Sequence, residues 1–164
     1  FVPNHIGVDH PWVRERPELL VQAEAGSAGS FRQETVRGLL WMAHGRDPYF
    51  HPWVDTAQVD YRSTAARQAI IQELQSVAAR CDGVRCDMAM LLLNEVFEQT
   101  WAKFPHSEPS PGTEFWSEAI DTVRRPGFIF LAEAYWDLED ELQSLGFDYT
   151  YNHYCPVKNP GKQG

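Results

Sequence analysis

Segments with helical and strand-like hydrophobic patterns alternate along the second half of the chain. Within residues 63–80, apolar residues recur every three or four positions behind Ser63, a favourable N-cap. One face of this helix would carry Ile70, Leu74, Val77 and Ala78. Similar patterns predict helices over 91–101, 114–124 and 137–146, and strands over 83–87, 128–133 and 147–151. Strands that alternate with helices in this way indicate an α/β fold with a parallel sheet and right-handed crossovers.

The first 60 residues follow a different pattern. Residues 1–5 have the character of the end of a buried strand. Residues 11–60 contain scattered Pro, Gly and Trp, and show little regular periodicity. A structureless loop of this length is unusual inside a compact domain unless it serves a function. We therefore treat residues 11–60 as a separate, loop-rich part of the chain.

Two of the predicted strands end in a carboxylate, namely Gly83-Val84-Arg85-Cys86-Asp87 and Phe130-Leu131-Ala132-Glu133. Strand alternation places Arg85 and Asp87 on one face, and a guanidinium beside a carboxylate favours the ionised form that a nucleophile needs. Glu133 follows an apolar run and precedes two aromatic residues, and burial there favours the protonated form that a proton donor needs. Adjacent strands lie about 4.8 Å apart, close to the roughly 5–5.5 Å between the carboxyl groups of retaining glycosidases. Taken alone, Asp87 has an alternative role as a structural partner of Arg85.

Three motifs in this order resemble a known family. Gly83 to Asp87 resembles the G-x-R-x-D nucleophile strand of the α-amylase superfamily, glycoside hydrolase family 13, and Phe130 to Glu133 resembles its acid/base strand. Phe1 to His5 is similar to the end of the family's D-x-x-x-N-H strand, without the leading Asp. The resemblance implies that residues 1–164 form an incomplete (β/α)8 TIM barrel, about strand 3 through strand 6. Residues 11–60 would then be a loop-rich subdomain inserted after strand 3. A complete barrel typically needs about 250 residues, so we interpret the chain as part of a larger enzyme.

The resemblance also implies an activity. The enzyme would be a retaining α-glycosidase or transglycosylase that acts on α-linked glucans, with Asp87 as nucleophile and Glu133 as acid/base. Arg85 would keep Asp87 ionised, and His5 would contact the reacting sugar. Asn4 is a further candidate for substrate binding. In some family members the residue that matches Asn4 helps to bind calcium, but one candidate ligand does not make a site, so we expect neither a metal nor a cofactor.

Tyr135 and Trp136 follow Glu133 directly. They would form a platform for a sugar ring or pack at the rim of the barrel, and the sequence does not decide between these roles. The family's Lys-His pair after the nucleophile is replaced by Met90 and Leu91, which leaves room for a different specificity or for transglycosylation. The family's later His-Asp motif, which supplies a third carboxylate, has no match in this chain. The rival hypothesis is a non-catalytic glycan-binding or interaction module on the same scaffold, or an inactive gene fragment.

Composition narrows the choice of partners. The net charge of −9 argues against binding to nucleic acid, whose phosphates require a basic surface. The longest apolar stretch, residues 88–93, is far too short to span a bilayer. We therefore expect an oligosaccharide or α-glucan as the ligand, and neither nucleic acid nor a membrane as a partner. The sequence gives no basis for assigning a cellular location.

Overall fold

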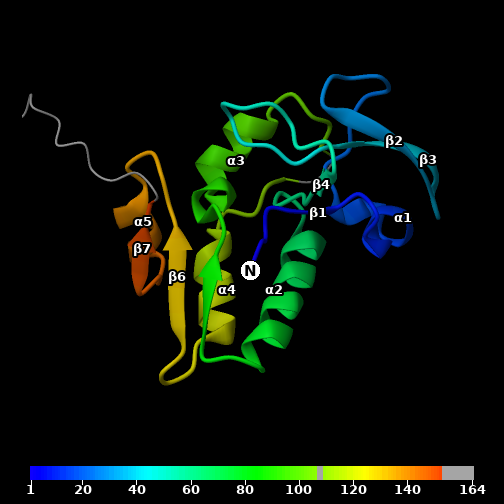
Figure 1. The fold of residues 1–164 in the computed structure, drawn as a ribbon. Coiled ribbons are helices and arrows are strands. Elements are labelled where there is room, and N and C mark those ends of the chain that lie inside the picture. Colours follow the sequence, from blue (N-terminus) through cyan, green and yellow to red (C-terminus); the bar gives the residue numbers. More distant parts are fainter. Residues whose placement is uncertain (107–108, 153–164) are drawn as a thin grey trace, which may run out of the picture.

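The computed structural model describes residues 1–106 and 109–152 of the chain. These residues contain three small sheets. Two are antiparallel pairs, formed by β1 (His5–Gly7) with β4 (Thr56–Gln58) and by β2 (Ser30–Thr35) with β3 (Gly38–Ala43). The third is parallel, in the order β5 (Gly83–Cys86), β6 (Ile129–Glu133) and β7 (Tyr149–Tyr151). Figure 1 shows the parallel sheet on one side of the molecule and the β2–β3 hairpin on the other.

The helices connect the strands largely as the hydrophobic pattern predicts. They are α1 (Pro11–Glu15), α2 (Thr64–Ala78), α3 (Asn94–Trp101), α4 (Phe115–Val123) and α5 (Glu139–Ser144), with short 3-10 turns η1 (Pro17–Leu19) and η2 (Ala89–Leu92). The single helix expected over 91–101 is instead divided into η2 and α3, because Leu93 between them has an extended backbone with ψ 135°. The sequence therefore located the helical segment but missed the break inside it.

The N-terminus of α2 confirms the predicted cap, since the Ser63 side chain accepts a hydrogen bond from the Ala66 backbone N–H. The expected helix face is confirmed for Ile70, Leu74 and Ala78, which are buried. It is wrong for Val77, which is 38% exposed. At 100° per residue Val77 lies roughly 60° from Leu74, at the margin of the buried arc.

The two faces of the parallel sheet have different environments. Val84, Cys86, Phe130 and Ala132 alternate onto one face and are buried. This face continues into the helical layer through Phe147, whose ring centroid lies 6.3 Å from that of Phe130 and 4.9 Å from that of Trp116 in α4. The alternate residues lie on the opposite face, where Ile129 and Tyr149 are 47% and 60% exposed.

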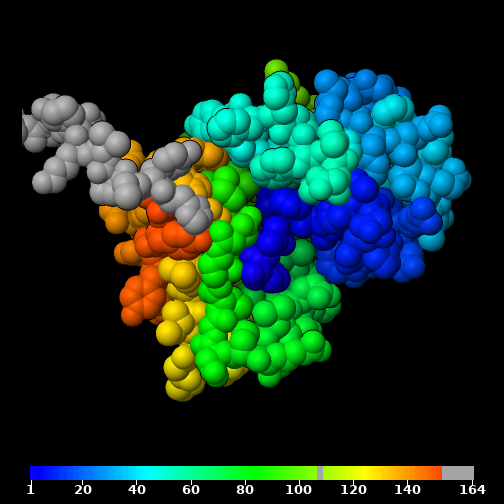
Figure 2. Space-filling model, in the orientation of Figure 1, coloured from blue at the N-terminus to red at the C-terminus, as the bar shows by residue number. Residues whose placement is uncertain are grey.

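The first residues of the chain lie against β5. The Phe1 nitrogen donates to the Arg85 carbonyl at 2.8 Å, and the Asp87 N–H donates to the Phe1 carbonyl at 2.9 Å. In a parallel ladder, a residue on one strand bonds to the residues before and after its partner on the other strand. Phe1 bonds in this way to Arg85 and Asp87, which flank Cys86. Figure 2 shows this segment in dark blue beside the green residues of β5. The expectation that residues 1–5 end a strand therefore agrees with the hydrogen bonds of Phe1, although β1 itself pairs with β4.

Residues 11–60 contain more regular structure than their pattern predicts. The β2–β3 hairpin pairs six residues with six, from Ser30 opposite Ala43 to Thr35 opposite Gly38. Strand periodicity was hard to see here because the hairpin has no fully buried face along its length. Its apolar residues Val36 and Leu39 are 71% and 53% exposed. Residues 30–43 thus form a regular hairpin inside the stretch that the pattern predicted to be loop-rich.

Candidate active site

Asp87 and Glu133 leave adjacent strands at the same level. Cys86 pairs with Ala132 in the parallel register, so the next residue on each strand is one of the two carboxylates. The Arg85 guanidinium contacts both of them. Its Nη1 lies 2.5 Å from Asp87 Oδ1, and its Nη2 lies 2.7 Å from Glu133 Oε2. The predicted alternation, which put Arg85 and Asp87 on one face, is consistent with this contact.

A third strand also contacts Arg85. The Nε of Arg85 donates a hydrogen bond to the Tyr151 hydroxyl of β7 at 2.6 Å. Partial burial disfavours the charged guanidinium, but the hydrogen bonds with Tyr151 and Asp87 and the charge of Glu133 outweigh it. The pKa of Arg85 therefore lies above its ordinary value. Arg85 is a fixed cation between the carboxylates.

Glu133 is the more enclosed of the two carboxylates, with a side chain 7% exposed against 28% for Asp87. Its Oε2 also accepts the Met88 backbone N–H at 3.1 Å, and its Oε1 accepts the Tyr135 hydroxyl at 2.8 Å. Met88 has φ 44° and ψ 48°, a left-handed conformation that is uncommon outside glycine. This unusual turn directly after Asp87 brings the Met88 N–H to the Glu133 carboxylate.

His5 is close enough to Asp87 for the carboxylate charge to act on its imidazole. Burial lowers its pKa from the ordinary value, although the charges of Asp87 and Asp55 oppose that effect. The imidazole is therefore neutral at neutral pH. Its ring packs against Trp53, with centroids 5.2 Å apart. His5 thus remains a candidate contact for a hydroxyl group.

Asn4 has a different environment from the one expected. It is only 2% exposed, and its side chain exchanges two hydrogen bonds with Gln58. Asn4 Nδ2 donates to Gln58 Oε1 at 3.2 Å, and Gln58 Nε2 donates to Asn4 Oδ1 at 3.1 Å. Both ends of the Asn4 amide are therefore used inside the protein, and its direct contact with substrate stays a prediction.

The two aromatic residues after Glu133 differ in environment. Tyr135 donates its hydroxyl to Glu133. Trp136 is 36% exposed, and its ring lies 5.0 Å from that of Tyr49 in an edge-to-face arrangement. Tyr49 belongs to residues 11–60, so this pair joins that segment to the turn after β6. Positive φ angles of 65° at Trp136 and 60° at Asp137 shape this turn.

Sequence reasoning missed Tyr151 and the Met88 backbone as parts of the site. The signal for Tyr151 was present in the alternation of residues 147–151, which puts Tyr149 and Tyr151 on one face. What the sequence lacked was the register that sets Tyr151 opposite Glu133. Nothing in the sequence pattern predicts the left-handed turn at Met88.

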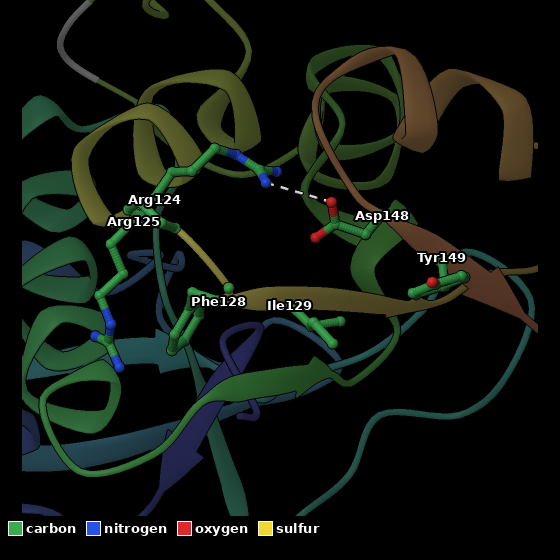
Figure 3. Close-up of a pocket in the computed structure, with 8 residues that line it drawn as sticks. Arg124, Arg125, Phe128, Ile129, Asp148 and Tyr149 are labelled. Atoms are coloured by element: carbon green, nitrogen blue, oxygen red, sulfur yellow. Dashed lines mark hydrogen bonds and ion pairs between the residues drawn. The ribbon is translucent and has the colours of Figure 1, made fainter.

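An open hollow of about 600 Å³ lies at the opposite end of β6 and β7 (Figure 3). Its two arginines are used for structure. Arg124 contacts Asp148 at 3.3 Å, and Arg125 donates to the carbonyls of Ala78 and Cys81 at 2.7 and 2.6 Å. Ile129, which lines the hollow, begins the strand that Glu133 ends. The hollow is therefore separate from the carboxylate pair.

Within residues 1–106 and 109–152, no group of three or more His, Cys, Asp or Glu side chains is arranged to hold a metal ion. Over the same two ranges, no helix has both the length and the apolar character needed to cross a membrane.

The chain matches no protein-family model and no curated protein sequence. Its fold is similar to that of solved α-amylases. One from H. orenii gives a TM-score of 0.57 at 18% identity, over 92% of this chain and 31% of that one. One from Lactobacillus plantarum gives a TM-score of 0.56 at 22% identity, over 90% of this chain and 30% of that one. A maltogenic α-amylase from Thermotoga neapolitana gives a TM-score of 0.52 at 21% identity, over 93% of this chain and 27% of that one.

This chain therefore spans about a third or less of the length of these proteins. Identities of this size establish a common fold and nothing finer. The chain has the α/β fold of part of an α-amylase, and the resemblance to glycoside hydrolase family 13 that its motifs predicted is confirmed at the level of the fold.

Proposed function

We propose that the protein containing this chain is a retaining glycosidase or transglycosylase that acts on α-linked glucans. The observation that carries the proposal is the shared guanidinium, because Arg85 contacts carboxylates from two adjacent strands at one level. The strand spacing of about 4.8 Å suits the separation of about 5–5.5 Å that double displacement requires. The α-amylase fold supports an α-glucan as the substrate class.

In the first step, an Asp87 oxygen attacks the anomeric carbon of the sugar. The bond from that carbon to the leaving oxygen breaks while Glu133 transfers its proton to that oxygen. The product is a β-linked ester on Asp87. Arg85 holds Asp87 Oδ1 and so orients the nucleophile before the attack.

In the second step, Glu133 removes a proton from water or from an acceptor sugar hydroxyl. The oxygen attacks the anomeric carbon, and the ester bond breaks to release Asp87. Asp87 carries no charge while it is esterified, so the Arg85 cation then acts mainly on Glu133, which it contacts through Nη2.

The surrounding residues would hold the sugar. We assign a hydroxyl contact to the neutral imidazole of His5 and a stacking surface to Trp136 with Tyr49. Asn4 would contribute indirectly, since its amide pair with Gln58 fixes the segment that carries His5. This mechanism requires no cofactor.

We also propose that the chain supplies strands 3 through 6 of a (β/α)8 barrel, with residues 11–60 inserted after strand 3. The ladder of Phe1 with β5 supports strand 3, and the order β5-β6-β7 supports the next three. The open inner face at Ile129 and Tyr149 is what an incomplete barrel would expose.

The test uses the complete gene product with maltose, malto-oligosaccharides, sucrose and trehalose as substrates. Asp87→Asn and Glu133→Gln should each reduce turnover by about 10³-fold or more, because both residues act in the chemical step. Asp121→Asn, an exposed position on α4, is the matched control and should leave turnover unchanged. With a glucosyl fluoride, whose leaving group needs no proton, Glu133→Gln should recover more first-step activity than Asp87→Asn. Turnover within tenfold of wild type for either variant on the natural substrate would contradict the proposal.

A further inference from the structure

Tyr151 is the third partner of the guanidinium that joins the two carboxylates. It lies opposite Glu133 in the register of β6 and β7, so its side chain rises at the level of the carboxylate pair. Its hydroxyl accepts Arg85 Nε–H at 2.6 Å, and the Arg85 Cζ lies 5.8 Å from the centre of its ring. The contact thus combines a short hydrogen bond with a cation–π arrangement.

The geometry of arginine explains why this contact matters. A guanidinium is planar, and its N–H donors form a rigid fork. Here Nε is bound by Tyr151, Nη1 by Asp87 and Nη2 by Glu133. Three partners on three consecutive strands fix the plane of the fork. With Nε released, the side chain, which is 38% exposed, gains freedom to rotate and to pair with one carboxylate at a time.

We propose that Tyr151 is a positioning residue that acts through Arg85. By holding Nε, it keeps one terminal nitrogen on the nucleophile and the other on the acid/base. This inference rests on the proposed function, in which the cation serves Asp87 in the first step and Glu133 in the second. It also gives β7 a part in the reaction that its sequence pattern did not predict.

The first experiment is a double-mutant cycle in the complete gene product, measured with an aryl α-glucoside for sensitivity. Tyr151→Phe should lower kcat about tenfold, the effect of one charge-assisted hydrogen bond, and should change KM less than twofold. In an Arg85→Lys background, which keeps the charge but removes the fork, the same substitution should change kcat less than twofold. Tyr149→Phe removes a hydroxyl from the same strand and the same sheet face, and it should have no effect in either background.

The second experiment is a crystal structure of the Tyr151→Phe variant, which does not depend on activity. We expect Arg85 to lose its contact with one of the two carboxylates. An unmoved guanidinium on both carboxylates, kcat within twofold of wild type, or equal losses in both backgrounds would each overturn the inference. If Asp87→Asn is inactive while any of these results is obtained, only the role of Tyr151 fails. If Asp87→Asn is active, the proposed function itself fails.

Discussion

The parallel sheet and the antiparallel N-terminal region use polar residues in opposite ways. On the parallel sheet, one face is a continuous apolar core, and the other carries Arg85, Glu133 and Tyr151 at the ends of three strands. In the antiparallel region, polar residues that resemble a binding site are used for structure. Asn4 and Gln58 are 2% and 0% exposed and bind each other.

The difference teaches that burial and polarity alone do not separate a residue of the proposed active site from a structural one. Asn4 and Glu133 are similarly buried, at 2% and 6% exposure. Glu133 lies at the C-terminal end of a parallel strand, beside a second carboxylate and a shared cation. The side chain of Asn4, by contrast, bonds to Gln58 of β4, the strand that pairs with β1. Position at the end of a parallel strand is what separates the two cases.

The largest difference that we expect between the two regions is in how much a core substitution lowers the stability of the protein. Phe130→Ala should lower the free energy of unfolding by about 3–5 kcal/mol, because Phe130 is fully buried against the rings of Phe128 and Phe147. Leu39→Ala in the hairpin should change it by less than about 0.5 kcal/mol, since Leu39 is 53% exposed. Urea denaturation of the complete gene product measures both. Similar losses at the two positions would show that the hairpin is as tightly packed as the sheet.

An intermediate effect is expected at the buried amide pair. Asn4→Ala should destabilise the protein by about 1–3 kcal/mol, because it leaves Gln58 Oε1 buried without the donor that Asn4 Nδ2 supplies. The double variant with Gln58→Leu should recover part of that loss, since both polar partners are then removed. If Asn4→Ala instead raises KM for glucan with little loss of stability, Asn4 contacts the substrate and the structural role is refuted.

The sequence predicted the parts of the fold that depend on local patterns. Ser63 and the spacing of Ile70 and Leu74 were sufficient for α2, and two strand-end carboxylates were sufficient to pair Asp87 with Glu133. The sequence did not predict contacts that depend on register between distant segments. Gln58 lies 54 residues from Asn4, and Tyr151 lies 66 residues from Arg85. Neither contact leaves a local signal, because each is set by which strands pair.

The smallest effect is a pH dependence at His5. Burial lowers the pKa of His5 in the folded protein below the ordinary value of 6.5, so the unfolded chain binds the proton more readily. The contribution of His5 to stability is therefore complete above pH 6.5 and is lost as the pH falls through 6.5 toward the folded pKa. His5→Asn should flatten the fall in melting temperature between pH 7 and pH 5.5. An unchanged slope would mean that His5 does not titrate differently on folding.

The stereochemistry of the first product tests the central claim most directly. If Asp87 and Glu133 carry out double displacement on an α-linked glucan, the anomeric configuration is retained, because carboxylates on adjacent strands leave no room for an intervening water. Proton NMR spectra recorded during early hydrolysis by the complete gene product should show the α-anomer first, before mutarotation forms the β-anomer. Initial appearance of the β-anomer would contradict the account.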